Sequence, residues 1–265
     1  MNFEQKIALV TGSSKGLGKV IAKEFAKRGC HVLLCSRPSE ALTNTADEII
    51  RAGGQCDVLA ADLTKTEEIK KIQEEVSKRF GRLDILINNL GGMKKFVPFD
   101  QISDQEWLEM FELNFFANMR ITRAFLPMMQ AQKWGRVINI SSEVAVQPEP
   151  LSQHYCAAKA AINNLTKSLS LAYGNQGILI NAVSPAFIMT PEIEHLIQKM
   201  AEKNQVSFDD TVTNLLKHQS RSKHSISRPA KPEEVAALVV FLASDLASYI
   251  NGSNFRVDGG SIATL

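Results

Sequence analysis

The alternation of short apolar runs with longer amphipathic segments restricts the fold of this chain more than any other feature. Seven runs rich in Val, Ile and Leu have the composition of buried strands: residues 7–10, 31–35, 57–61, 84–88, 135–140, 178–184 and 254–257. Segments 19–29, 41–54 and 67–81 place apolar residues three and four apart and end at glycine, as helices do. This alternation predicts an α/β fold, a doubly wound parallel sheet with helices on both faces.

No linker, repeat or low-complexity tract separates two domains, so we expect a single domain over residues 1–265. Residues 191–228 interrupt the alternation with two further helical segments. The second begins with Ser207 and Asp210 at the spacing of a capping box. We expect a small helical insertion that forms a substrate lid over one end of the sheet. A last helix then begins at Pro232, a residue that suits the first helical position.

Charge and cysteine content restrict the function. The formal net charge is only +2, so neither a nucleic acid nor a membrane surface is the expected partner. The four cysteines show no C-x-x-C spacing, and we expect free thiols in a reducing compartment, with no disulfide and no metal site. We see no leader and no run of membrane-span length. These features predict a soluble, cytoplasmic protein that acts on small molecules.

A glycine-rich turn joins the first predicted strand to the first helix, with the sequence T-G-S-S-K-G-L-G over residues 11–18. Glycine permits a tight turn and close approach to a pyrophosphate, whose charge the N–H groups of the following helix would face. A glycine triplet alone is weak evidence, and an ordinary strand-to-helix corner is the alternative. Its position after the first strand favours a Rossmann-type dinucleotide site with these loop residues: Gly12, Ser14, Lys15, Gly16, Leu17 and Gly18.

The end of the second predicted strand bears on the choice between NADP(H) and NAD(H). A carboxylate there would bond the ribose hydroxyls of NAD(H), whereas an arginine would pair with the 2′-phosphate of NADP(H). The sequence has Ser36 and Arg37 at this place, no acidic residue before Glu40, and Lys15 in the glycine loop. Two cations where the cofactor must lie favour NADP(H). The alternative is that both are ordinary solvated side chains.

Tyr155 and Lys159 lie one helical turn apart in the segment H-Y-C-A-A-K-A-A. Residues at i and i+4 share one helix face, so an ammonium about 6 Å from the phenol is expected to lower the pKa of Tyr155 by roughly 2. Such a phenol could exchange protons near neutrality. The pair by itself is common on amphipathic helices, and chance is the alternative explanation.

Further motifs accompany this pair: N-N-L-G at 88–91, E-L-N-F-F at 112–116, I-N-I-S-S-E at 138–143 and S-P-A-F-I-M-T at 184–190. With them the chain resembles the short-chain dehydrogenase/reductase family over nearly its whole length. The resemblance implies a catalytic tetrad of Asn114, Ser142, Tyr155 and Lys159, and further cofactor contacts from Asp62, Leu63, Asn89, Gly91, Pro185, Ile188 and Thr190 besides Tyr155 and Lys159. The chain departs from the family pattern at Leu90, expected to crowd the cofactor groove, and at Ala186, expected to need no positive φ.

The resemblance also implies a reaction, hydride transfer from NADPH to the carbon of a ketone. Tyr155 would give a proton to the developing alkoxide, and Ser142 would hold the carbonyl oxygen. Lys159 would bind the nicotinamide ribose, and Asn114 would hold a water of the proton relay. The branch that the chain resembles most is that of the 3-oxoacyl-carrier-protein reductases. We therefore expect a 3-oxoacyl thioester or related carbonyl substrate, a possible acyl carrier protein partner, and a homotetramer or homodimer.

Two segments bear on the substrate. The stretch 217–228 holds four cations, two histidines and no carboxylate, and it would suit an acidic carrier protein or the phosphates of coenzyme A. A solvated basic loop is the alternative. An apolar pocket wall, or else core, is expected from Met93, Phe96, Val97, Phe99, Phe187, Ile188 and Met189. Two other functions stay open: a dehydrogenase of a sugar, polyol or secondary metabolite, and a non-catalytic NADP(H)-binding sensor.

Overall fold

The computed structural model describes residues 1–93, 95–219 and 226–263. Its strands form one parallel sheet in the order β3-β2-β1-β4-β5-β6-β7. The strands are β1 (Ile7–Thr11), β2 (His31–Ser36), β3 (Gln55–Ala60), β4 (Ile85–Asn88), β5 (Gly135–Ile140), β6 (Ile178–Pro185) and β7 (Asn254–Val257). The seven strands predicted from the sequence are all present, and their ends differ from the prediction by no more than two residues.

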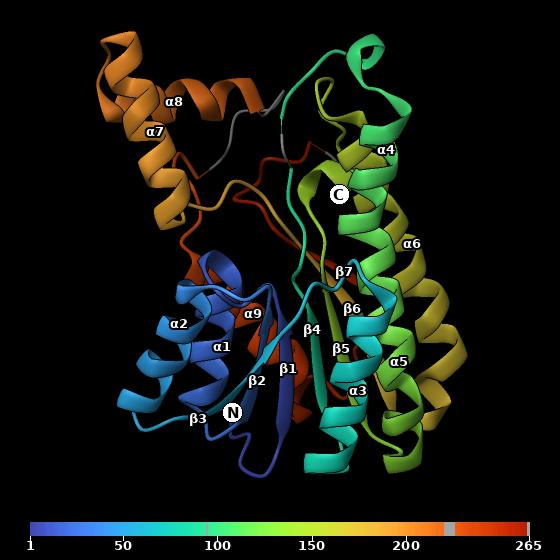
Figure 1. Cartoon of the computed structure of the whole chain (residues 1–265). Helices are drawn as coiled ribbons and strands as arrows, with labels where there is room; N and C mark the ends of the chain where they lie inside the picture. Colours follow the sequence, from blue (N-terminus) through green and yellow to red (C-terminus); the bar gives the residue numbers. More distant parts are fainter. Residues whose placement is uncertain (94, 220–225, 264–265) are drawn as a thin grey trace.

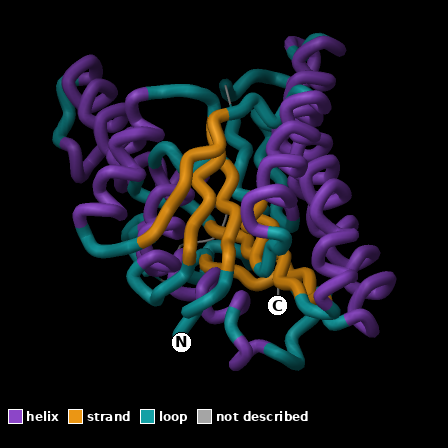
Figure 2. The backbone as a smooth tube through the Cα atoms, turned by 60° about the horizontal axis from the view of Figure 1, so that its bottom comes forward, coloured by secondary structure: helices purple, strands orange, loops and turns teal. Residues whose placement is uncertain are grey.

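Helices cover both faces of this sheet, as predicted (Figure 1). Seen from below, the strands form a twisted layer between two helical layers (Figure 2). The helices are α1 (Gly16–Ala26), α2 (Glu40–Arg51), α3 (Thr66–Phe80), α4 (Asp104–Phe111), α5 (Ala117–Gln132), α6 (Gln153–Tyr173), α7 (Pro191–Asn204), α8 (Phe208–Gln219) and α9 (Pro232–Ala243). The Rossmann-type architecture expected from the alternation of elements is therefore confirmed.

Two apolar cores hold the layers together. Phe25 of α1, Ile49 of α2 and Val239 of α9 are buried against one face of the sheet. Ile72 of α3 and Phe125 of α5 are buried against the other face. Because both faces are covered, β1 and β4 are buried at every position, which explains why these strands read as continuous apolar runs rather than alternating ones.

The strand order places a crevice at the centre of the sheet. The chain proceeds from β1 outward to β2 and β3, then returns to form β4 on the other side of β1. Connections after β1 and β4 therefore leave in opposite directions at the carboxyl ends of the strands. Ligands of open α/β sheets bind at such a reversal. The glycine loop follows β1 and the N-N-L-G motif follows β4, so both line this crevice.

The predicted insertion forms α7 and α8, which lie beyond the carboxyl ends of the strands, on the opposite side from α4 (Figure 1). Ser207 and Asp210 interact at the start of α8 as the predicted spacing allows: the backbone N–H of Asp210 donates to the Ser207 hydroxyl at 3.0 Å, and that hydroxyl donates to Asp210 Oδ2 at 2.7 Å. Pro232 is the first residue of α9, as predicted. The role of α7 and α8 as a lid stays a prediction.

Candidate active site

Glycine geometry and Asn89 together fix the loop between β1 and α1. Gly12 and Gly16 have φ of +63° and +55°, which other residues rarely adopt. A Cβ on Gly18 would lie only 2.5 Å from Nδ2 of Asn89. That amide donates to the carbonyl of Thr11 at 2.9 Å and to that of Gly12 at 3.2 Å. The loop therefore presents bare backbone to the crevice, as a pyrophosphate requires.

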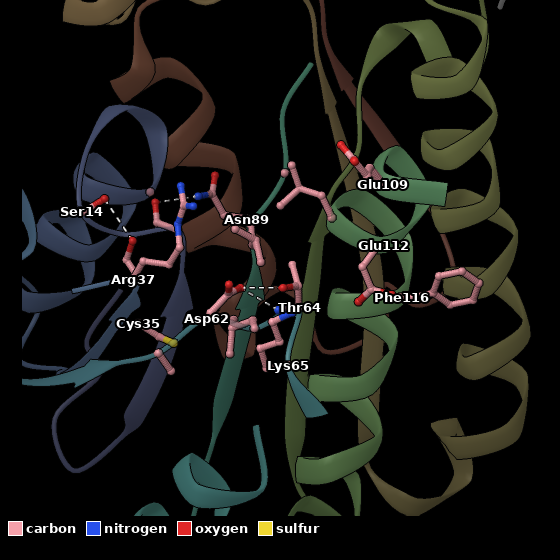
Figure 3. A pocket seen from close by; sticks show the side chains of 18 of the residues that line it. Ser14, Cys35, Arg37, Asp62, Thr64, Lys65, Asn89, Glu109, Glu112 and Phe116 are labelled. Carbon is pink, nitrogen blue, oxygen red and sulfur yellow. Dashed lines mark hydrogen bonds between the residues drawn. The ribbon is translucent and has the colours of Figure 1, made fainter. Parts of the chain in front are cut away.

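A cavity of about 880 Å³ extends from this loop over the carboxyl ends of the central strands. Most of the residues predicted to bind the cofactor line it: Gly12, Ser14, Lys15, Leu17, Gly18, Arg37, Asp62, Leu63, Asn89 and Gly91. Ser14 and Arg37 lie on one side, and Glu109, Glu112 and Phe116 come from the helical segment opposite (Figure 3). The volume lies within the range of about 300–1,000 Å³ that small-molecule and cofactor sites occupy.

Three cations line this cavity, and the charges of two of them, Arg37 and Lys65, act on Asp62 at one end. Lys15 and Arg37 were predicted, and Lys65 joins them as a third exposed lining residue. Asp62 lies beside them, and its Oδ1 accepts the backbone N–H and hydroxyl of Thr64 at 3.0 and 2.8 Å. Burial opposes ionisation of Asp62, but the Thr64 hydrogen bonds and the charges of Arg37 and Lys65 hold its pKa below the usual value. This end of the cavity therefore presents an excess of positive charge.

The structure brings Ser142 and Tyr155 together. Ser142 follows β5 by two residues and accepts the backbone N–H of Val144 at 3.4 Å, which caps a short 3₁₀ turn. Tyr155 lies in the first turn of α6, and the Ser142 hydroxyl is close enough to its phenol to act on the pKa of Tyr155. A hydroxyl and a phenol that line the same cavity in this way are placed to hold one carbonyl oxygen between them.

Lys159 lies one turn further along α6, as the spacing predicted. Its side chain is 3% exposed, and its Nζ lies 5.7 Å from the centroid of the Tyr155 ring. The ammonium donates to the carbonyl of Ile140, the last residue of β5, at 2.8 Å. Burial lowers the pKa of Lys159 to about 8, so at pH 7 the charged form still predominates.

The expected lowering of the Tyr155 pKa is wrong. Burial raises the pKa of Tyr155 to about 12; the nearby Ser142 hydroxyl opposes this rise, and the charges of Cys156 and Glu143 add to it. Sequence spacing gives the position of the Lys159 ammonium but says nothing of desolvation, which is the largest cause of the raised pKa. Tyr155 is consequently protonated at neutral pH, the state that a proton donor needs.

Asn114 is fully buried in a π-helical turn, Glu112–Phe116, between α4 and α5. Its Oδ1 accepts the backbone N–H of Gly92 at 2.9 Å, and its Nδ2 donates to the Gly92 carbonyl at 3.0 Å. A Cβ on Gly91 would lie 2.6 Å from this Oδ1 and 3.2 Å from Nζ of Lys159. Asn114 thus lies next to Lys159, behind the segment that follows β4, and π turns recur at functional sites.

A second cavity of about 410 Å³ lies beside the first, and Leu17, Asn89 and Gly91 line both. Its wall holds Ser142, Tyr155 and Lys159 together with three predicted cofactor residues from the end of β6 and the loop after it: Pro185, Ile188 and Thr190. A substrate carbonyl in the second cavity can therefore lie next to a nicotinamide that extends from the first. Thr190 also caps α7 by accepting the backbone N–H of Ile193 at 3.4 Å.

The predicted apolar wall is only partly present. Met93, Phe96, Phe187 and Ile188 line the second cavity, but Val97, Phe99 and Met189 do not. Phe99 is 63% exposed and packs edge-on against Trp107, with 6.4 Å between ring centroids. The apolar pattern of this segment failed to separate pocket from surface because it has no regular period.

Ala186 and Leu90, the two residues that depart from the family pattern, both have defined backbone or packing contacts. Ala186 does not have a positive φ, as expected, and its backbone N–H donates to the carbonyl of Val257 at 3.1 Å. Leu90 lines the larger cavity and also packs against the core on the α5 side.

Three further sequence predictions concern the basic stretch, the cysteines and membrane-spanning helices. Most of the basic stretch 217–228 lies outside the described side chains; its last residue, Arg228, pairs with both carboxylate oxygens of Glu234 at 2.7 and 2.8 Å. The four cysteines are free, and Cys30, Cys35 and Cys156 are buried. Across the described ranges, no helix is both long and apolar enough to cross a membrane.

Comparison with known proteins decides the family. The model of the short chain dehydrogenase family matches residues 6–201, about three quarters of the chain. The chain belongs to this family. An oxidoreductase of uncharacterised function from Bacillus subtilis, YvrD, is 35% identical over 100% of this chain and 99% of its own length. The 3-oxoacyl-[acyl-carrier-protein] reductase FabG of Thermotoga maritima is 30% identical over 99% and 100%.

A solved structure extends the likeness to the whole fold. The L-sorbose reductase of Gluconobacter frateurii, in complex with NADPH and L-sorbose, is 32% identical and superposes with a TM-score of 0.92, covering 100% of this chain and 99% of that chain. This short chain dehydrogenase is thus similar both to a reductase of acyl thioesters and to a reductase of a ketose. Similarity to these relatives therefore does not distinguish between the two substrate classes.

Several lining residues of this short chain dehydrogenase were not predicted from the sequence, and Lys65 and Glu143 are the two that bear on the chemistry. Lys65 follows the Asp62-Leu63 pair within three residues, and a search for cations near that pair would have found it. Glu143 directly follows Ser142 and lines the second cavity. No sequence signal marks Glu143, because an acidic residue after a strand is usually solvated.

Proposed function

We propose that this protein reduces a ketone to a secondary alcohol with NADPH, with Tyr155 as the general acid. The main observation behind the proposal is that Ser142, Tyr155 and Lys159 together line a cavity that adjoins the dinucleotide cavity. When bound, the nicotinamide supplies the hydride. The residues of the chain then have to orient the carbonyl and deliver one proton to its oxygen.

Each member of the predicted tetrad has a separate task. The Ser142 hydroxyl holds the carbonyl oxygen, and Tyr155, protonated at neutral pH, gives its proton to that oxygen. The buried Lys159 ammonium lies 5.7 Å from the Tyr155 ring centroid and stabilises the phenolate that remains after proton transfer. Asn114 positions the backbone of Gly92 and has Nζ of Lys159 nearby, where a relay water would sit.

The charges of the dinucleotide cavity support NADP(H) rather than NAD(H). Lys15, Arg37 and Lys65 line the cavity and are exposed, so all three are available to pair with phosphates of the cofactor. The partner that NAD(H) requires, a carboxylate at the end of β2, is absent from the sequence between Ser36 and Ser39. Similar proteins of known structure hold NADPH or NADP.

Two substrate classes have support. The similarity to FabG and the apolar side chains of Met93, Phe96 and Phe187 favour a 3-oxoacyl thioester. The similarity to the L-sorbose reductase favours a keto sugar. An acyl carrier protein as partner, assembly as a dimer or tetramer, and a cytoplasmic location stay predictions. A dehydrogenase that oxidises an alcohol would use the same residues in the reverse reaction. A non-catalytic NADP(H)-binding sensor would have no need of an assembled catalytic tetrad.

Turnover with matched variants tests the proposal. Purified protein is offered NADPH, with NADH in parallel, and four carbonyl compounds: an acetoacetyl thioester, a simple diketone, a ketohexose and an aldehyde. We expect oxidation of NADPH with at least one of them, and loss of turnover by about 10²- to 10⁴-fold in Tyr155→Phe with NADPH binding retained. The control is Tyr249→Phe, because Tyr249 is fully exposed. Turnover retained in Tyr155→Phe would show that another group donates the proton.

A further inference from the structure

Glu143 is a buried carboxylate in the wall of the substrate cavity. It follows Ser142 directly, it is 8% exposed, and the cavity that holds Ser142, Tyr155 and Lys159 includes it. Its Oε2 accepts a hydrogen bond from the hydroxyl of Ser261. A carboxylate removed from water needs such partners, and a single hydroxyl satisfies only one of its roughly four acceptor positions.

The C-terminal segment holds this carboxylate in place. After β7, the carboxylate of Asp258 accepts the backbone N–H of Gly260 at 3.1 Å and that of Ile262 at 3.4 Å, which forms the turn that carries Ser261. Gln147 ties the same segment to the turn after Ser142: its Nε2 donates to the Ser261 carbonyl at 3.5 Å, and its Oε1 accepts the backbone N–H of Ala263 at 3.1 Å. Glu143 is therefore fixed rather than free to turn toward solvent.

The charges around this cavity are unusual for a site that binds an acyl chain. Glu143 and Glu149 both line it, and Lys159 is the one lining cation among the described residues. The Lys159 ammonium already donates to the carbonyl of Ile140. Glu143 and Tyr155 line the same cavity, and the charge of Glu143 makes a small contribution to the raised pKa of Tyr155.

We propose that Glu143 selects neutral polyhydroxylated ketones, such as ketoses, by accepting hydrogen bonds from substrate hydroxyls close to the reacting carbonyl. The proposal rests on the proposed function, since it names the substrate class of the same site. The free acceptor positions of Glu143 suit neighbouring O–H groups of a sugar, and Glu149 offers a second acceptor on the same wall. In this proposal Glu143 determines substrate specificity, and Tyr155 still supplies the proton.

Other substrate classes fit this wall less well. An alkyl chain packed on Glu143 would leave a buried carboxylate with unfilled acceptor positions, a cost that strongly disfavours analogues without the hydroxyl. A keto acid would place a second negative charge beside Glu143 and Glu149. An amino ketone would satisfy the carboxylates, but its ammonium would lie near the Lys159 ammonium in the same cavity.

The test compares substrates that differ only in their hydroxyls. Purified full-length protein and NADPH are offered L-sorbose, D-fructose, 2-hexanone, 2,3-hexanedione, an amino ketone and an acetoacetyl thioester, and kcat and KM are measured for each. We expect a kcat/KM for at least one ketohexose that exceeds that for 2-hexanone by at least about 100-fold. Reduction of the diketone or the thioester with no detectable reduction of a ketohexose would overturn this proposal and leave the proposed function in place.

Variants of Glu143 give the second readout. In Glu143→Gln, which keeps the shape and an acceptor for Ser261, the KM for the ketohexose should rise at least about tenfold while kcat/KM for 2,3-hexanedione changes less than about threefold. For Glu143→Asp, which keeps the charge, the KM for the ketohexose should lie between the values for the wild type and for Glu143→Gln. The control is Glu67→Gln, an exposed carboxylate in the first turn of α3, and thermal unfolding verifies that each variant folds.

The outcomes separate the two proposals. An equal loss with both substrates in Glu143→Gln would show that Glu143 acts on Tyr155 or on the fold and not on hydroxyl recognition. A preference for the amino ketone would assign the carboxylates to an ammonium instead. If none of the carbonyl compounds is reduced although the protein binds NADPH, the proposed function and this proposal are both overturned.

Discussion

The Lys159 ammonium donates a 2.8 Å hydrogen bond to the carbonyl of Ile140, which joins α6 to the last residue of β5. Ser142 lies two residues beyond Ile140, and Tyr155 lies one turn before Lys159. This hydrogen bond, together with the one that the Ser141 hydroxyl donates to the Lys159 carbonyl at 3.3 Å, joins the strand end that carries the serine to the helix that carries the tyrosine. The contact buries a charge at the centre of the site, and that burial has a measurable cost.

Lys159→Met should abolish turnover and change the pH dependence of stability. The pKa of Lys159 lies at about 8 instead of the usual 10.5, so between these values the unfolded chain binds more protons than the folded one. The free energy of unfolding of the wild type consequently gains about 3 kcal/mol from this group as the pH rises from 8 to 10.5. The variant lacks that gain, so its stability relative to the wild type should fall by that amount over the same window.

Urea unfolding of both proteins at several pH values between 7 and 10.5 measures this difference. Lys167→Met is the control, because Lys167 is exposed on the same helix. A constant difference between Lys159→Met and the wild type across this range would show that the folded state does not depress the pKa of Lys159.

Gly91→Ala should impair catalysis through a steric effect. Its Cβ would meet Oδ1 of Asn114 at 2.6 Å and Nζ of Lys159 at 3.2 Å, so one of these side chains has to move. We expect a loss in kcat of at least about tenfold, with about 1–3 kcal/mol lost from the free energy of unfolding. Gly53→Ala is the matched control: its φ of +80° strains an alanine, but nothing lies within 4 Å of the new Cβ. A Gly91→Ala enzyme with unchanged kcat would mean that the tetrad tolerates this displacement.

Arg37→Asp should reverse or narrow the preference for NADPH. The change removes a cation from the cavity that Lys15 and Lys65 also line, and it introduces a carboxylate at the place that bonds ribose hydroxyls. We expect the Kd for NADPH to rise at least about tenfold and that for NADH to rise less or to fall, as measured by cofactor fluorescence titration. Arg51→Asp, at an exposed position in the last turn of α2, controls for net charge. An unchanged ratio of the two Kd values would remove Arg37 from cofactor discrimination.

Local sequence patterns were sufficient for the fold and for most of the site. The strands and crossover helices could be predicted because a buried parallel strand needs a continuous apolar run and an amphipathic helix needs a 3.6-residue period. The glycine loop could be predicted because positive φ at Gly12 and Gly16 is a property that few residues share. The position of Lys159 beside Tyr155 followed from helix geometry alone.

The sequence by itself thus determined which elements form, in which order they carry the reactive side chains, and where the dinucleotide cavity opens. Only the tertiary structure decided the electrostatics of the site. Desolvation raises the pKa of Tyr155 where spacing alone predicted the opposite. The contact of Ser261 with Glu143 joins residues 118 positions apart, and it depends on how β7 and the turn after β5 pack. Burial and long-range contacts are properties of the packed chain, and no local pattern encodes them.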